Sequence, residues 1–407
     1  MQLRNNFNQP NYDPLLLWII LILSGVGLVM VYSASVDMAA LKQISNYQNY
    51  YYLLRHFVYL IISMFCGFIA FLIPISFWQK FAPSFFILGL ILLIAVLIPG
   101  IGKIVNGSQR WIPLGFMNFQ PSEIVKLFTI IYAADYVLRK SRQIGTFTKG
   151  FLPISLAIAI VGTLLINQPD FGALVVVVCI SLGILFLGGI SLKLILGLTL
   201  SVPVGMYALL KVAPYRMDRI TGFLAPFEDL YGKGWQLSHS LIAIGRGDFF
   251  GVGLGESIQK LQYLPEAHTD FVLAILSEEL GLFGFTLIIC LYILMIIRIF
   301  GISKISTQLR NNFSALLAQG IAIWFGIQAI INIGVNVGFF PTKGLTLPFV
   351  SYGGSALLVT FIASGILMRI DYENKIKAKK KLIQHRFFLL LPALAGISCL
   401  QWQLLIN

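Results

Sequence analysis

Residues 263–270 read Tyr-Leu-Pro-Glu-Ala-His-Thr-Asp, and residues 271–300 continue as an almost wholly apolar run, FVLAILSEELGLFGFTLIICLYILMIIRIF. A helix needs roughly 20 mostly apolar residues to cross the hydrocarbon core of a membrane, and this run is longer. The octapeptide before it brings a Pro, two carboxylates and a His to the mouth of that helix. The sequence therefore predicts a membrane span with polar chemistry at one end.

The composition of the whole chain agrees with this prediction. Of its 407 residues, 58% are hydrophobic and only 11% are charged, whereas soluble domains carry about 25% charged residues. Because irregular backbone and open sheet edges cannot face lipid, we expect an all-α polytopic membrane protein of about ten helices. The predicted spans are 15–33, 57–75, 81–98, 124–138, 151–166, 173–187, 190–212, 271–300, 315–337 and 355–370.

The formal net charge of +13 is distributed in a way that indicates topology and does not favour a nucleic-acid partner. Basic residues gather in the loops at 139–149 and 298–310 and in the start of the tail at 369–381. With ten spans these segments fall on one side, which the positive-inside rule makes cytoplasmic. The outer face then receives the longer loops, and long loops in compact proteins tend to be functional. The largest outer loop covers residues 212–269.

Several outer loops carry ionisable groups that have both a structural and a functional interpretation. Glu123 lies in the first turn of a predicted helix, where it is either a cap or the partner of Lys126, three residues on. Arg110, beside Trp111, is either an interface anchor or a ligand for anionic substrate. Asp170 belongs to a Pro-Asp-x-Gly turn, which accounts for it fully, and a functional role is the alternative.

The largest outer loop supplies further cations and a glycine-rich stretch. Arg216, Arg219 and Arg246 are suited to binding a phosphate. The spacing of Gly251, Gly253 and Gly255 is weak evidence for a phosphate loop, and glycines that permit turns or close backbone approach are the better interpretation.

Asp270 has two interpretations, a helix cap and a catalytic base, and they lead to different functions. As the N-cap of the eighth predicted helix it would contribute about 1 kcal/mol, and as a base it would face a lipid-borne substrate. Glu278 and Glu279 follow inside the apolar run, where adjacent acids need partners or a polar cavity. Lys343, the single charge of the loop before the last span, is either an interface anchor or a fixed cation.

These loops together resemble the SEDS (shape, elongation, division and sporulation) family. The matching segments occur in family order between about residues 15 and 369. Some segments, such as Gln259–His268 and Pro341–Thr346, resemble the division members more than the elongation members. The quoted matches are GSQRWI at 107, FQPSE at 119, QPDFG at 168, LPEAHTDF at 264, SEELG at 277 and LPFVSYGGS at 347.

The resemblance implies a peptidoglycan glycosyltransferase that polymerises lipid II into glycan strands at the division septum. It places the catalytic Asp in the His-Thr-Asp motif, so Asp270 is the expected general base, with inversion at the donor sugar and undecaprenyl pyrophosphate as the leaving group. Cationic side chains are expected to contact the departing phosphates, and nearby polar groups are expected to support the site. The expected substrate-binding residues are Arg110, Lys343, Glu266, His268, Arg216 and Arg246.

The same resemblance implies a multi-pass protein of the bacterial cytoplasmic membrane, enriched at the septum and active on the outer face. Its expected partners are lipid II and the nascent strand, a class B penicillin-binding transpeptidase and other membrane proteins of the divisome. No organic cofactor is expected, and a divalent cation such as Mg²⁺ is left open. Two alternatives also stay open: a lipid II flippase, and a non-enzymatic septal scaffold.

We divide the chain into a transmembrane domain, residues 1–370, and a tail, residues 371–407. The tail has a basic run and an extra apolar stretch, Phe387–Leu400, which departs from the family pattern. Because this stretch is short and contains Pro392, one interpretation places it at the membrane interface; the other is that it spans, which would put the C-terminus outside.

Overall fold

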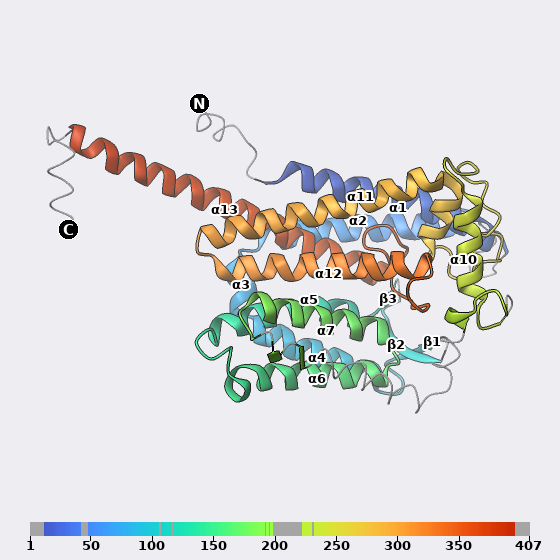
Figure 1. The fold of residues 1–407 in the computed structure, drawn as a ribbon, viewed down its shortest axis with the longest axis horizontal. Coiled ribbons are helices and arrows are strands. Elements are labelled where there is room, and N and C mark those ends of the chain that lie inside the picture. Colours follow the sequence, from blue (N-terminus) through green and yellow to red (C-terminus); the bar gives the residue numbers. More distant parts are fainter. Residues whose placement is uncertain are drawn as a thin grey trace.

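The computed structural model describes residues 12–41, 48–105, 107–115, 117–191, 193–194, 196–197, 222–229 and 232–394, with side chains to residue 383. Long helices lie side by side in one bundle (Figure 1). Each predicted span corresponds to a helix except 190–212, most of which lies outside the described residues. The helices are α1 (Pro14–Leu41), α2 (Tyr51–Leu72), α3 (Ile75–Lys80), α4 (Ala82–Leu97), α5 (Pro121–Arg139), η2 (Phe147–Phe151), α6 (Leu152–Asn167), α7 (Phe171–Leu187), α10 (Trp235–Arg246), α11 (Val272–Gln308), α12 (Asn312–Asn336) and α13 (Gly354–Leu394).

The helical polytopic membrane fold predicted from the sequence is confirmed. In the described part of the chain, six helical stretches are long and apolar enough to cross a membrane, and α4 and α7 are apolar but shorter. Helix α12 lies deep in the bundle, because 72% of its most apolar window is buried. The spanning stretches are 14–40, 51–72, 147–167, 272–308, 312–336 and 354–383.

The connections gather at two ends of the bundle (Figure 1). One end, called here the basic end, holds the α5–α6 connection, the α11–α12 turn and the exit of α13, which are the three basic segments of the sequence. The other, called here the loop end, holds α10, the segment 247–270 and a small sheet. The predicted grouping of the basic segments on one side is thus confirmed.

The sheet at the loop end was not predicted. Its strands β1 (Lys103–Val105), β2 (Ser108–Pro113) and β3 (Asn118–Phe119) pair antiparallel in the order β1-β2-β3. The strands are too short to show a clear alternation of polar and apolar residues. Their pairing provides hydrogen-bond partners for the backbone N–H and C=O groups of this loop. The sheet leads directly into α5, so it fixes where that helix begins.

Helix α13 extends well past the predicted end at residue 370. The segment after Ile370 has five Lys between residues 371 and 381, and Lys favours helix. In addition, i,i+4 ion pairs join Arg369 to Glu373 (2.7 Å) and Asp371 to Lys375 (3.0 Å). The basic run and the first part of the stretch at 387–400 therefore belong to one helix that projects from the basic end (Figure 1).

Close helix packing holds α2 and α13 together in the core. A Cβ atom at Gly365 would overlap the carbonyl oxygen of Gly67, and one at Gly67 would lie 2.7 Å from the carbonyl oxygen of Phe361. Small residues let two helix backbones approach in this way when lipid supplies no hydrophobic drive between them. This contact fixes the first part of α13, which follows the loop of Lys343, against α2.

Candidate active site

The loops singled out in the sequence meet one another at the loop end. A Cβ atom at Gly172 would lie 2.9 Å from the side chain of Leu345, and one at Gly344 would lie 2.9 Å from Oδ2 of Asp270. The N–H of Tyr352 donates to the carbonyl of His268 at 3.0 Å. The His-Thr-Asp segment, the Pro-Asp turn and the loop before α13 therefore pack against one another at this end.

The interpretation of Asp270 as the N-cap of α11 is wrong, because it does not occupy that position. The N-cap position is Phe271, and the N–H of Ala274 donates to Oδ1 of Asn336 at 3.1 Å. The carbonyl of Asp270 accepts from the amides of Asn332 (2.9 Å) and Asn336 (3.2 Å) on α12. The backbone of Asp270 is thus held by α12, and its half-buried carboxylate lies beside the main chain of Gly344.

Lys343 precedes that glycine. It is half-buried, and its carbonyl accepts from the N–H of Leu345 at 3.0 Å. Asn332 also donates to the carbonyl of Leu345 at 2.7 Å. One asparagine on α12 therefore binds the main chain of both the Asp270 segment and the loop of Lys343, which holds these two segments next to each other.

Glu266 and His268 shape the turn that leads to Asp270. Glu266 adopts a φ of 54°, an uncommon conformation for a residue with a side chain. Its carbonyl accepts from the N–H groups of Thr269 and Asp270, both at 3.1 Å. The ring of His268, 7% exposed, lies 4.9 Å from that of Tyr52 and 5.3 Å from that of Tyr352. Burial raises the pKa of Tyr352 well above its usual range, so its phenol stays neutral.

Arg110 lies on β2 and binds the Pro-Asp turn. Its Nε donates to the carbonyl of Gln168 at 3.0 Å, and its Nη2 donates to the carbonyl of Pro169. The side chain is half-buried. The guanidinium therefore joins the small sheet to the turn that begins α7.

Arg246, at the end of α10, has a different environment. Its Nη1 lies 2.5 Å from Oε1 of Glu278, whose side chain is fully buried. This contact explains how one of the two adjacent acids in the apolar run is accommodated. Arg216 and Arg219, the other two cations of the largest loop, lie outside the described residues.

The Glu123–Lys126 pair predicted from i,i+3 spacing is confirmed. Nζ of Lys126 lies 2.8 Å from Oε2 of Glu123 and 2.9 Å from Oε1 of Gln328 on α12, with the side chain of Lys126 fully buried. It also lies 5.2 Å from the ring centre of Trp324. Glu123 also lies in the first turn of α5, as predicted, while the N-cap position itself is Gln120.

Asp170 caps α7, as the turn chemistry predicts. Its Oδ1 accepts from the N–H of Ala173 at 3.2 Å. Its Oδ2 accepts from Oγ of Ser122 (2.8 Å) and from Nε2 of Gln120 (3.0 Å). Asp170 is 3% exposed, so it ties the start of α7 to the start of α5.

The comparisons with known proteins identify the family. The model of the cell cycle protein family of FtsW, RodA and SpoVE matches residues 14–376. The chain belongs to this family. One family relative, from Aromatoleum aromaticum, is 50% identical over 89% of this chain and 88% of its own length. Another, from Coxiella burnetii, is 46% identical over 90% of this chain and 97% of its own length. Both are named as probable peptidoglycan glycosyltransferase FtsW.

Solved structures of family members have the same fold. A chain of a peptidoglycan synthase complex that coordinates polymerization and crosslinking aligns with a TM-score of 0.73 at 26% identity, over 89% of this chain and 98% of that one. The rod shape determining protein RodA of Thermus thermophilus aligns with a TM-score of 0.65 at 26% identity, over 88% of this chain and 96% of that one. The fold is therefore that of the family over nearly the whole length.

Sequence reasoning missed three polar residues that hold the surface around Asp270. Asn332 and Asn336 lie one turn apart inside an apolar span, and that position is itself a signal, because polar groups at membrane depth are costly and usually have a partner. Lys260 is 7% exposed and binds Glu279 at 3.1 Å. Its position in a loop gave no such signal.

Proposed function

We propose that this chain is a peptidoglycan glycosyltransferase that polymerises lipid II outside the cytoplasmic membrane, with Asp270 as the general base. The observation that carries the proposal is the position of Asp270. It is not the N-cap of α11, its backbone is fixed by two asparagines, and its carboxylate lies beside the loop of Lys343. Membership of the family, with relatives named for this activity, supports the same conclusion.

In the proposed reaction a sugar hydroxyl of incoming lipid II attacks the anomeric carbon of the growing strand. Asp270 takes the proton of that hydroxyl as the new glycosidic bond forms. The bond between the anomeric carbon and the lipid pyrophosphate breaks, and undecaprenyl pyrophosphate leaves. Displacement from the opposite face inverts an α-linked donor and gives a β-linked strand. Since pyrophosphate is a good leaving group, a second carboxylic acid of the kind found in glycosidases is not needed.

Negative charge grows on the pyrophosphate as it departs, and fixed positive charge stabilises it. We assign this role to Lys343, on the loop beside Asp270, with Arg110, which binds the Pro-Asp turn, as a second candidate. Arg246 fits it less well, because its guanidinium is committed to the buried carboxylate of Glu278. Glu266 and His268 are assigned to shaping the turn that carries the base.

A divalent cation would need oxygen or nitrogen ligands that converge. Within the described ranges, no group of three or more His, Cys, Asp or Glu side chains is arranged to hold a metal ion. Because Mg²⁺ is usually bound by one or two carboxylates together with substrate phosphates, a cation held partly by the substrate stays open, and we derive no step of the reaction through one.

We further propose that the protein acts at the division septum in a complex with a class B penicillin-binding transpeptidase and other divisome membrane proteins. The support is similarity to relatives named FtsW, and to a chain from a synthase complex that coordinates polymerization and crosslinking. The basic end would face the cytoplasm under the positive-inside rule, which puts Asp270 and the loops at the opposite end of the bundle outside.

The test is glycan-strand synthesis from purified lipid II in liposomes. Wild type, Asp270→Asn and Asp270→Ala are each copurified with the cognate transpeptidase. We expect polymer from wild type and none from either variant, with the complex intact. Undiminished polymer from both variants would remove Asp270 from the chemistry. Failure of every sample to polymerise, despite an intact complex, would favour the flippase or scaffold instead.

A further inference from the structure

Glu278 and Glu279 are adjacent, fully buried carboxylates in α11, about two turns after Asp270. The proposed reaction does not use them. A buried carboxylate is costly unless it is paired and hydrogen-bonded, so the partners that these two residues bind indicate what they hold in place.

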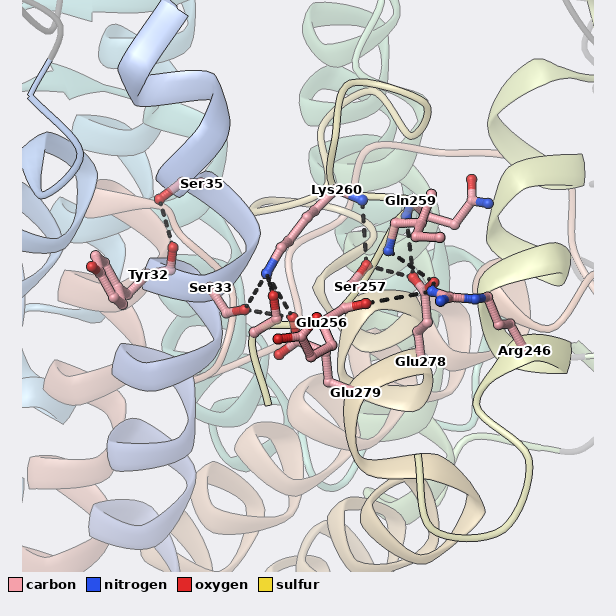
Figure 2. Close-up of polar contacts among 12 residues, drawn as sticks. Tyr32, Ser33, Ser35, Arg246, Glu256, Ser257, Gln259, Lys260, Glu278 and Glu279 are labelled. Atoms are coloured by element: carbon pink, nitrogen blue, oxygen red, sulfur yellow. Dashed lines mark hydrogen bonds and ion pairs between the residues drawn. The ribbon is translucent and has the colours of Figure 1, made fainter. Parts of the chain in front are cut away.

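Glu278 gathers donors from the loop that leads to Asp270 (Figure 2). Oε1 accepts from the N–H of Ile258 at 3.1 Å, and Oε2 accepts from the N–H of Gln259 at 3.3 Å and from Oγ of Ser257. Both ends of the segment 258–278 are therefore joined through one side chain. Asp270 lies near the middle of this closed segment.

Glu279 extends the same anchor to α1. Oγ of Ser33 donates to Oε1 of Glu279 at 2.6 Å, and Nζ of Lys260 lies 3.1 Å from the same oxygen. Nζ of Lys260 also lies 3.2 Å from Oγ of Ser33, so the three groups form a triangle between α1, the loop and α11 (Figure 2). The loop before Asp270 is thus tied to two helices.

The backbone of α11 is broken beside this pair. Gly281 has a φ of 67° and a ψ of −165°, which interrupts the helical hydrogen bonds. The glycine-rich loop compensates, because the N–H groups of Val252 and Gly253 donate to the carbonyls of Glu278 (3.0 Å) and Glu279 (3.1 Å). A Cβ atom at Gly251 would overlap the carbonyl of Glu279. Side chains and backbone therefore fix the loop to α11 at the same point.

We propose that Glu278, Glu279 and Lys260 are positioning residues for the general base. They hold the segment 258–278 in one shape, so that Asp270 is presented to the acceptor hydroxyl at a fixed place. The inference rests on the proposed function. The alternative is that the two acids only stabilise the fold, in which case activity per folded molecule would not depend on them.

The Lys260–Glu279 pair allows stability and positioning to be separated. Removing one partner would leave an uncompensated buried charge, whereas replacing both with apolar residues of similar volume is often neutral for stability. The informative variant is therefore the double substitution Lys260→Met with Glu279→Leu. Its matched control is Asp135→Leu with Arg139→Met, which removes an ion pair of 2.6 Å with a largely buried carboxylate on α5.

Initial rates of lipid II polymerisation are measured against lipid II concentration for both double variants, as intact complexes with the transpeptidase. For Lys260→Met/Glu279→Leu we expect kcat to fall about tenfold or more, since small misplacement of a reacting group costs that much. We expect KM to stay within about twofold, because substrate binding is not the quantity disturbed. The thermal midpoint should fall only modestly, because the hydroxyl of Ser33 and the carbonyl of Gly255 lose a partner but no buried charge is left unpaired. The control keeps wild-type kcat. Wild-type kcat in the test variant would overturn the proposal.

A charge reversal tests the same inference without depending on the apolar variant. Glu279→Lys and Lys260→Glu should each lower kcat, and the double reversal should recover at least about tenfold over either single variant, because the two charges can again pair. A double reversal no better than the singles would contradict positioning by this pair. Wild type and Asp270→Asn are assayed alongside. Absence of polymer from wild type would count against the proposed function, whereas normal kcat in the pair variants with no polymer from Asp270→Asn would count against the positioning role alone.

Discussion

Asn332 on α12 donates one amide hydrogen to the carbonyl of Asp270 at 2.9 Å and another to the carbonyl of Leu345 at 2.7 Å. The proposed base and the loop of Lys343 are therefore held by a single side chain, itself 2% exposed. Helix α12 therefore sets the separation between the Asp270 segment and the loop of Lys343.

Replacement of Asn332 tests this relationship. Asn332→Leu leaves the carbonyl of Leu345 without its donor, which costs about 1–3 kcal/mol for a buried group, and leaves the carbonyl of Asp270 with Asn336 alone. We expect a lower thermal midpoint in detergent and a lower polymerisation rate. Ser314→Ala is the control on the same helix, since the buried hydroxyl of Ser314 has no hydrogen-bond partner in the part of the chain that the structure describes. Equal effects of the two substitutions would contradict a bridging role for Asn332.

The absence of a side chain at Gly344 lets the carboxylate of Asp270 approach the loop. Gly344→Ala would bring a Cβ atom to 2.9 Å from Oδ2, which is closer than real Cβ contacts allow, so the carboxylate must shift. We expect polymerisation to fall about tenfold or more while the thermal midpoint changes little. Gly353→Ala, in the same loop, is the control, because its Cβ atom would meet ordinary contacts at 3.4 Å and 3.6 Å. Wild-type activity in Gly344→Ala would show that the carboxylate does not need this position.

The sequence predicts what depends on local pattern and misses what depends on distant partners. Apolar runs locate the spans, i,i+3 spacing predicts the Glu123–Lys126 pair, and turn residues predict the cap at Asp170. The partner of Glu279 could not be predicted in this way, since Ser33 lies 246 positions earlier in the chain. The N-cap interpretation of Asp270 failed for the same reason, because Asn336 on another helix binds the N–H of Ala274.

The contributions of Glu123 and Lys126, the buried ion pair of α5, to the free energy of unfolding should be strongly coupled. Lys126→Met leaves the carboxylate of Glu123, 6% exposed, without its cation, and breaking a buried pair in this way costs about 3–5 kcal/mol. Lys126→Met combined with Glu123→Leu should recover much of that loss. Thermal unfolding of the three proteins in one detergent measures the coupling. A thermal midpoint of the double variant below that of Lys126→Met would contradict a net cost from the unpaired charge.

Substitutions at Asp170 separate its role as the cap of α7 from its role as a link between α7 and α5. Asp170→Asn keeps a side-chain oxygen for the N–H of Ala173, and Asn is as good an N-cap as Asp, so the cap itself should survive. Asp170→Ala removes the cap, at about 1 kcal/mol, together with the acceptor for Ser122 and Gln120. We therefore expect Asp170→Ala to lower the thermal midpoint more than Asp170→Asn, with polymerisation retained in the Asn variant. Loss of polymer in Asp170→Asn at an unchanged thermal midpoint would instead assign Asp170 a part in the chemistry.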